Sequence, residues 1–150
     1  MRDNLFIRPL IAEDKKAWFS MWKEYVASSE VTTSNEVCEI LYDRLLSGDL
    51  RECKCLIAEM SGKPVGLAHY LYHRNTLTVE DTCYMIDLFV ESDLRGKGVG
   101  RALVEMVHTT AKQNGIPSTY WETKDSNQNG RRLYEKIATK IPYIMYQKED

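Results

Sequence analysis

The residues best suited to do chemistry lie between Asp87 and Arg101, in the run DLFVESDLRGKGVGR. Glycine occupies every second position just before a predicted helix: Gly96, Gly98 and Gly100. Because glycine has no Cβ, such a turn can present successive backbone N–H groups to an anion, and the helix start adds its own unpaired donors. Cationic side chains surround the turn: Arg95, Lys97 and Arg101. This combination predicts a cradle for a pyrophosphate rather than for a carboxylate.

The spacing of these glycines differs from that of two common phosphate loops. A P-loop reads G-x-x-x-x-G-K-[ST], and the segment has neither that spacing nor a hydroxyl residue after a lysine. A dinucleotide-binding fold needs G-x-G-x-x-G after its first strand, whereas G-x-G-x-G stands here two-thirds of the way along the chain. A glycine turn that only caps an ordinary helix is the structural alternative.

Histidine and cysteine residues do not form a metal-binding pattern. Cys53 and Cys55 lack the second pair that a zinc site needs, and a strand would place both on one face. His69 and His73 lie in a segment rich in β-favouring residues, where their side chains would be about 13 Å apart at ~3.3 Å per residue. We therefore expect no metal ion and four free thiols.

The elements that must position the cradle follow from hydrophobic periodicity and turn residues. Apolar residues at helical spacing, such as Trp18 with Met21, predict amphipathic helices. The expected strands are 5–9, 53–60, 65–72, 82–90, 118–123 and 141–147. The expected helices lie around 18–25, from a cap at Ser34 or Asn35 to Gly48, from Val99 to Asn114, and at 127–137.

This order of elements predicts an α+β fold with a mixed, mainly antiparallel, twisted sheet flanked by helices, because antiparallel strands come first and a strand–helix–strand unit follows. A chain of 150 residues with 43% hydrophobic residues fits one globular domain spanning 1–150. The net charge of -2 provides no field for binding nucleic acid. No apolar run approaches the ~18 residues of a membrane span, and no apolar signal core follows the charged start, so we expect a cytoplasmic protein without membrane partners.

Two motifs resemble those of one known family. The pattern R-G-x-G-x-G-R after Leu-Phe-Val is similar to the acetyl-CoA pyrophosphate loop of the GNAT N-acetyltransferase superfamily. The run from Asn127 to Lys136 resembles that family's N-x-x-A-x-x-L-Y-x-K helix, with Gly130 at the alanine position. The expected order of elements matches the GNAT acyl-CoA N-acyltransferase fold (α/β/α) along the whole chain. The nearest likeness is to small diamine acetyltransferases and to fungal histone, polyamine and D-amino-acid acetyltransferases.

The resemblance implies a role for each matching position. The backbone of Leu88–Val90 would pair with the pantetheine arm of acetyl-CoA, and the glycine turn would hold the pyrophosphate. Tyr134 would protonate the departing thiolate, which a phenol of pKa about 10 can do without being charged at rest. The implied cofactor-binding set is Leu88, Phe89, Val90, Arg95, Gly96, Lys97, Gly98, Val99, Gly100, Arg101, Asn127, Gly130 and Tyr134.

The group that deprotonates the acceptor amine is less well defined. The diamine subgroup has a glutamate before D-L-F-V, and this chain has Ile86 there. Asp87 is the first candidate base, although regular alternation would turn it to the face opposite Ile86 unless the strand bulges. Glu122 is the second candidate, and a water chain is the third. Acidic residues near the acceptor side would attract a cation: Glu80, Asp81, Asp87, Glu91 and Asp93. Three tyrosines are candidates for the pocket wall: Tyr25, Tyr72 and Tyr84.

The resemblance therefore implies an enzyme that transfers an acetyl group from acetyl-CoA to a primary amine of a small molecule, such as a polyamine, a diamine or an amino acid. None of the cysteines lies in the motifs, so direct transfer in a ternary complex is expected. Two alternatives remain: a protein lysine acetyltransferase, and a non-catalytic acyl-CoA sensor. The apolar run 141–146 would form a strand with an unpaired edge. Such an edge can pair with a second copy of the chain, which favours a homodimer.

Overall fold

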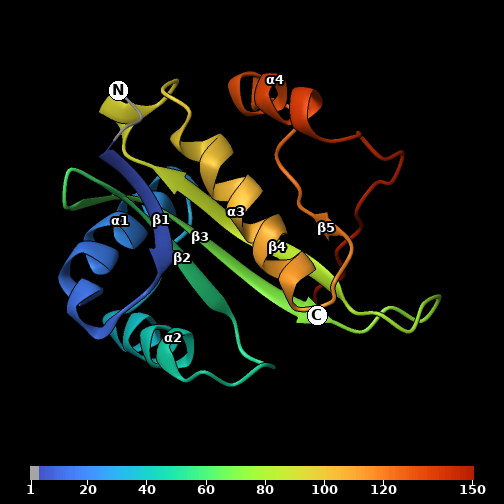
Figure 1. Cartoon of the computed structure of the whole chain (residues 1–150), viewed down its shortest axis with the longest axis horizontal. Helices are drawn as coiled ribbons and strands as arrows, with labels where there is room; N and C mark the ends of the chain where they lie inside the picture. Colours follow the sequence, from blue (N-terminus) through green and yellow to red (C-terminus); the bar gives the residue numbers. More distant parts are fainter. Residues whose placement is uncertain (1–3) are drawn as a thin grey trace.

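A five-stranded sheet forms the centre of the molecule in the computed structural model, which describes residues 4–150 (Figure 1). The strands lie side by side in chain order: β1 (Leu5–Pro9), β2 (Lys54–Met60), β3 (Lys63–His73), β4 (Thr82–Val90) and β5 (Thr119–Tyr120). β1 to β4 pair antiparallel, whereas β5 is parallel to β4. The mixed, mainly antiparallel sheet confirms the expected α+β class.

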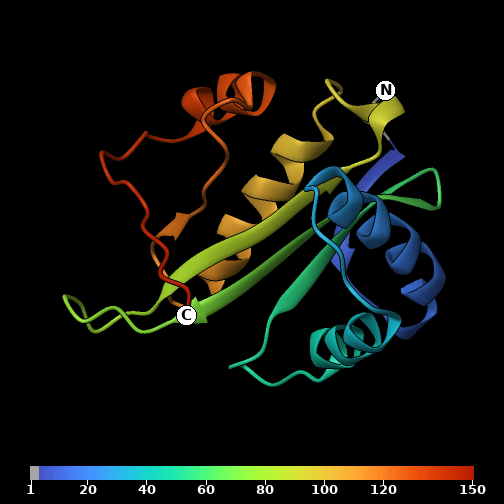
Figure 2. The ribbon, with the colours of Figure 1, turned by 180° about the vertical axis from the view of Figure 1, so that it is seen from behind.

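Helices cover both faces of this sheet. On one face lie α1 (Lys15–Ser28) and α2 (Asn35–Leu46), which stand in front of the sheet in Figure 2. On the other face lies α3 (Val99–Gln113), in front in Figure 1, with α4 (Gln128–Ile137) beyond its N-terminal end. Short 3₁₀ turns at Ala12–Asp14 and Ser92–Leu94 precede α1 and α3.

Each face has its own buried core. Trp18 and Met21 of α1 pack with Ile57 of β2 on one face, and both Trp18 and Ile57 are fully buried. Leu103 and Val107 of α3 fill the other face. Burial of a side chain of this size contributes about 1.5–3 kcal/mol. These two cores fix the sheet between its helices and hold the β4–α3 junction in place.

The expected elements are confirmed in number and order up to α4, with shifts at their ends. Ser34 caps α2, because its Oγ accepts a hydrogen bond from the Val37 N–H at 3.1 Å. β5 is shorter than the expected strand 118–123 and keeps only Thr119 and Tyr120.

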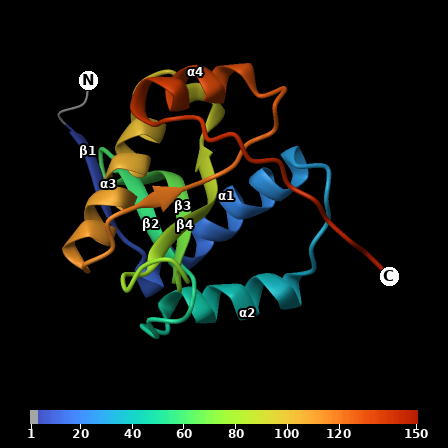
Figure 3. The same ribbon diagram turned by 90° about the vertical axis from the view of Figure 1, so that its right-hand side faces the viewer.

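The expected terminal strand 141–147 is wrong. Residues 138–150, all of them described, form no helix or strand, and Figure 3 shows them running as an extended coil away from α4. A strand needs a neighbouring ladder, and an apolar sequence alone does not supply one. The large apolar side chains of this tail are exposed by 53–88%: Ile141, Tyr143, Ile144, Met145 and Tyr146.

Three further features bear on function. No helix within residues 4–150 is long and apolar enough to cross a membrane. In the same part of the chain, no three potential ligand side chains of His, Cys, Asp or Glu gather around a point that could hold a metal ion. The four cysteines are free thiols, and three of them are buried: Cys38, Cys55 and Cys83.

Candidate active site

A β-bulge at Ile86 decides which face of the sheet Asp87 occupies. In the β3–β4 ladder His69 lies opposite Asp87 and Tyr70 lies opposite Met85, which leaves Ile86 as an extra residue. Met85 packs in the core on the α3 face. Regular alternation would place Asp87 on that same face, but the bulge shifts the pattern by one residue. Asp87 therefore shares the α1 face with His69.

Buried side chains hold the Asp87 carboxylate. Asp87 Oδ2 lies 3.0 Å from His69 Nδ1, and Trp18 Nε1 donates to His69 Nε2, also at 3.0 Å. The side chain of His69 is 2% exposed and that of Asp87 is 15% exposed. The sequence presents His69 only as a possible metal ligand and Trp18 only as a residue of a helix. The contact between His69 and Asp87 depends on the register of β3 and β4, which cannot be read from the sequence.

Tyrosines from two other elements lie around Tyr25, which is itself next to Asp87. Tyr25 of α1 is half-buried, and burial raises the pKa of its phenol, as does the nearby Asp87 carboxylate. Tyr134 of α4 and Tyr84 of β4 are close enough to raise the pKa of Tyr25 further. Burial also raises the pKa of Tyr134 above its ordinary value of 10.0, so its hydroxyl stays protonated at neutral pH. The predicted acid and the predicted base thus lie around the same tyrosine.

The sheet opens beside this group of side chains. β5 pairs with β4 only at Cys83–Thr119 and Tyr84–Tyr120, although β4 continues to Val90. Beyond that point the chain leaves the sheet and leads to α4 (Figure 1). Backbone groups of β4 that point away from β3 are therefore open to an added strand-like ligand along 85–90. One of them is already used, because Arg95 Nε donates to the Val90 carbonyl at 3.0 Å.

The predicted cradle lies at the end of this open edge. Gly96 and Gly98 both have positive φ, at 78° and 87°, a conformation that a side chain would strain. Gly98 is the N-cap of α3, so it lies at the end of the helix where the N–H groups of the first turn are unpaired within the helix. Lys97 is exposed beside it, whereas Arg101 is paired with Glu105 at 3.0 Å. The turn has the geometry of an anion cradle at a helix N-terminus.

Asn127 caps α4 in this structure. Its Oδ1 accepts from the Gly130 N–H at 3.2 Å, and its Nδ2 donates to Thr123 Oγ1 at 2.9 Å. A Cβ on Gly130 would lie 2.4 Å from Asn127 Nδ2, so this cap depends on the glycine. Leu133 of the same helix packs toward Gly100, whose added Cβ would lie 3.9 Å from Leu133 Cδ2. α4 therefore borders the cradle, and the Asn127 amide is engaged within the chain.

Glu122, the second candidate base, belongs to an exposed aromatic group near the β4–β5 pair. The Tyr84 hydroxyl donates to Glu122 Oε1, and the rings of Tyr84 and Tyr120 stack with centroids 4.8 Å apart. The Tyr120 hydroxyl lies 2.8 Å from His73 Nε2. Because Glu122 is exposed and already accepts from Tyr84, it is the weaker candidate of the two acids.

Two expectations about the pocket are wrong. Tyr72 does not line it, because this residue packs against the core on the α3 face and its hydroxyl accepts from Asn114 Nδ2. The acidic residues do not gather in one place either, since β4 separates those of the β3–β4 loop from those beside the cradle. In that loop Asp81 is paired with Arg74 at 2.7 Å. Of these five acidic residues, Asp87 is the one that lies near Tyr25 and Tyr84.

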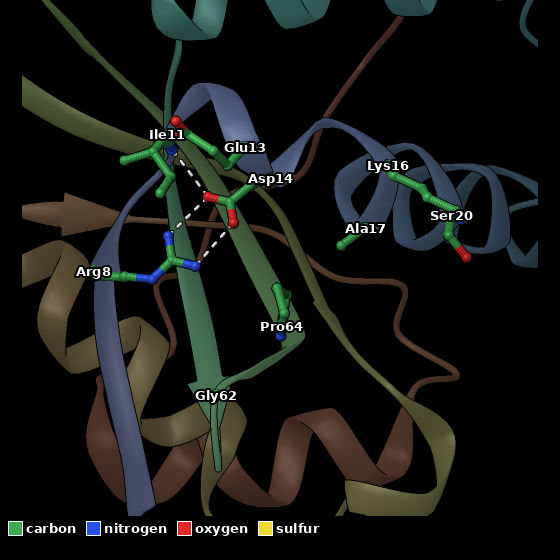
Figure 4. Close-up of a pocket in the computed structure, with 9 residues that line it drawn as sticks. All are labelled: Arg8, Ile11, Glu13, Asp14, Lys16, Ala17, Ser20, Gly62 and Pro64. Carbon is green, nitrogen blue, oxygen red and sulfur yellow. Dashed lines mark hydrogen bonds and ion pairs between the residues drawn. The ribbon is translucent and has the colours of Figure 1, made fainter.

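A hollow at the start of α1 is a different feature. It lies between the end of β1, the first turn of α1 and the β2–β3 turn (Figure 4). Arg8 binds both oxygens of Asp14 there, at 2.7 and 2.8 Å. Burial works to raise the pKa of Asp14, but hydrogen bonds from Arg8 and from the Ile11 N–H outweigh it and hold the pKa below its usual range. This ion pair ties β1 to α1 and is structural.

A family comparison agrees with this geometry. The model of the acetyltransferase (GNAT) family matches residues 16–138, which include β4, the cradle and α4. The chain belongs to this family. The GNAT resemblance is thereby confirmed, and so is its enzyme class.

One relative of this GNAT protein matches nearly end to end. The D-amino-acid N-acetyltransferase HPA3 of Saccharomyces cerevisiae (strain ATCC 204508 / S288c) is 32% identical over 149 residues, which cover 99% of this chain and 92% of that protein. The uncharacterized N-acetyltransferase YhfO of Bacillus subtilis (strain 168) is 31% identical over 85 residues, 57% of each chain. The protein is therefore an N-acetyltransferase of the GNAT type, which sets aside the sensor alternative.

Solved structures show the same fold. The aminoglycoside acetyltransferase AAC(6')-Iy in complex with a CoA bisubstrate analogue has a TM-score of 0.84 at 15% identity, covering 97% of this chain and 98% of that one. The ribosomal-protein-alanine N-acetyltransferase of Brucella melitensis biovar Abortus 2308 has a TM-score of 0.77 at 20% identity, covering 97% and 99%. At these identities the likeness establishes the fold alone.

Proposed function

We propose that this GNAT protein transfers an acetyl group from acetyl-CoA to the primary amine of a small molecule, by direct attack in a ternary complex. The observation that carries the proposal is the placement of Asp87 by the β4 bulge: the carboxylate, held by His69, lies near Tyr25, and the half-buried phenol of Tyr134 lies near the same tyrosine. A proton acceptor and a proton donor in one place are what amine acetylation requires.

The residues of the open edge and the cradle fit acetyl-CoA. Positive φ at Gly96 and Gly98 leaves their amides uncovered by side chains, which suits a pyrophosphate approaching the start of α3. The backbone of 88–90, whose Val90 carbonyl also accepts from Arg95, suits the amide groups of a pantetheine arm. Arg95 and Lys97 supply charge, while Asn127 and Gly130 border the arm from α4. When bound, the thioester supplies the electrophilic carbonyl carbon.

The side chains then divide the proton transfers between them. An alkyl ammonium of pKa ~10.4 must lose a proton before its nitrogen can attack, and Asp87 is the group we propose to accept it. As the C–N bond forms and the C–S bond breaks, the Tyr134 hydroxyl donates its proton to the departing sulfur. As the amide forms, the nitrogen loses its second proton to water, the Tyr134 phenolate regains a proton from water, and Asp87 releases its proton on the acceptor side. Each step balances without a covalent enzyme intermediate.

The acceptor we propose is a small amine. Support comes from the relative HPA3, whose name gives D-amino acids, and from the tyrosines and the carboxylate around the opening. The test is CoA release from acetyl-CoA in the presence of D- and L-amino acids, polyamines, aminoglycosides and a basic peptide. Acceptor-dependent release with a small amine supports the proposal. Release with the peptide alone would instead make the protein a lysine acetyltransferase.

We also propose a homodimer in which the tail 141–146 of each copy lies on the sheet edge of the other. The apolar side chains of this segment are exposed in the single chain, and β5 is an edge strand only two residues long. Burying this segment on the partner's sheet edge would cover the exposed apolar side chains and would pair the free strand edge. Light scattering should give twice the 17.4 kDa chain mass, and a chain ending at residue 137 should give a monomer. A full-length monomer at working concentration would contradict the proposal.

A further inference from the structure

The tautomer of His69 follows from its hydrogen bonds. The indole N–H of Trp18 is a donor only, so His69 Nε2 must accept with its lone pair. A neutral imidazole then carries its single proton on Nδ1, which lies 3.0 Å from Asp87 Oδ2. His69 therefore donates to Asp87, and the ring is neutral in this arrangement.

The surroundings of His69 keep the ring in one orientation. The ring lies between aromatic side chains of α1, with centroid distances of 5.9 Å to Trp18 and 4.8 Å to Trp22. Trp18 itself is fully buried and packs against Tyr42 of α2, with ring centroids 5.1 Å apart. Neither nitrogen of the imidazole is left over for another partner. The hydrogen bond to Asp87 is thus built on a rigid support.

The bulge makes this support necessary. A bulge interrupts the ladder locally, and Asp87 is the first paired residue after the extra residue Ile86. Without a donor at Oδ2, the carboxylate could rotate about its side-chain torsions. With the donor in place, one oxygen is fixed and the partly exposed carboxylate keeps one direction.

We propose that His69 is a positioning residue for acetyl transfer: fixed by Trp18 in the form protonated on Nδ1, it holds Asp87 Oδ2 so that the carboxylate accepts the proton of the acceptor amine. This inference rests on the proposed role of Asp87 as the base. His69 does not touch the reacting atoms, and it acts only through Asp87.

A double-mutant cycle tests this role, with His69→Leu, Asp87→Asn and the combined variant. His69→Leu should lower kcat by about 10²-fold, the effect of misplacing a catalytic group by ~1 Å, while the Kd for acetyl-CoA stays unchanged. In the Asp87→Asn background the same change should leave kcat unaltered, because the group that His69 holds is gone. The same loss in both backgrounds would show a merely structural role. The matched control is His108→Leu, which also removes a histidine Nδ1 hydrogen bond, to Thr119 Oγ1, and should leave kcat unchanged.

A second variant keeps the test valid if His69→Leu unfolds. The amide nitrogen of His69→Asn can stand where Nδ1 stands and donate to Asp87, so this variant should recover most of the lost kcat. Failure of the folded His69→Asn variant to exceed His69→Leu would overturn the proposal. Nitrogen NMR on the unaltered protein provides an independent check, in which the proton should reside on Nδ1. A proton on Nε2 at neutral pH would also overturn it.

The outcomes separate this inference from the proposed function. If Asp87→Asn loses turnover while His69→Leu keeps it, Asp87 remains the base and only the role of His69 is refuted. If Asp87→Asn keeps full turnover, the assigned base is wrong and the role of His69 fails with it.

Discussion

Replacing Tyr134 with phenylalanine should lower kcat by about 10² to 10⁴-fold, the usual contribution of general acid catalysis. At 1.36 kcal/mol per factor of ten this is about 2.7–5.4 kcal/mol of transition-state stabilisation. The ring should stay in place, because Tyr134 packs edge-on against Trp121 with centroids 5.4 Å apart, a contact that phenylalanine preserves. The change therefore removes the hydroxyl and little else.

The assay for Tyr134→Phe is thiol release from acetyl-CoA with the best acceptor amine, alongside calorimetry of acetyl-CoA binding. Since burial raises the pKa of Tyr134, the phenol stays protonated throughout the neutral range, and the loss should be the same across that range. The matched control is Tyr72→Phe, an identical change at a tyrosine that packs on the α3 face and does not line the pocket. Wild-type turnover in Tyr134→Phe would refute the assignment of the acid, since the sulfur would then leave unprotonated or through water.

Three further predictions concern the cradle and the core. Gly98→Val should weaken acetyl-CoA binding by about tenfold or more, because φ of 87° strains any side chain; unchanged affinity by calorimetry would contradict the cradle. Asp14→Asn should lower the free energy of unfolding by about 3 kcal/mol. In the unaltered protein this contribution should be present above pH 3.8 and should vanish as the pH falls through the lowered pKa of folded Asp14. Urea titrations at several pH values can check both expectations. Gly66→Ala should cost about 2 kcal/mol in the same titrations, because its Cβ would lie 2.8 Å from the Phe89 carbonyl oxygen, and an unchanged midpoint would show that the strands can separate.

The sequence predicts those parts of the fold that depend on local pattern. The glycine turn and the start of α3 follow from three glycines before a periodic helix, and the β2–β3 hairpin follows from its turn residues. These features need no knowledge of distant contacts. The order of the elements and the family follow from the same short motifs.

Features that depend on pairing between distant segments could not be predicted in the same way. The bulge at Ile86 is a property of the β3–β4 register, so the sequence left the face of Asp87 open. The predicted terminal strand 141–147 is wrong for the same reason, because an apolar pattern does not specify which strand edge would pair with it.

The most direct test of the account is kcat for Asp87→Asn, measured with the amine that gives the fastest wild-type rate, together with the Kd for acetyl-CoA. Glu122→Gln is the matched comparison, since it makes the same change of carboxylate to amide at the other candidate base. We expect Asp87→Asn to lose about 10² to 10⁴-fold in kcat with unchanged acetyl-CoA affinity, and Glu122→Gln to keep its turnover. Wild-type kcat in Asp87→Asn, with the loss appearing in Glu122→Gln instead, would move the base to the segment after β5 and contradict the account.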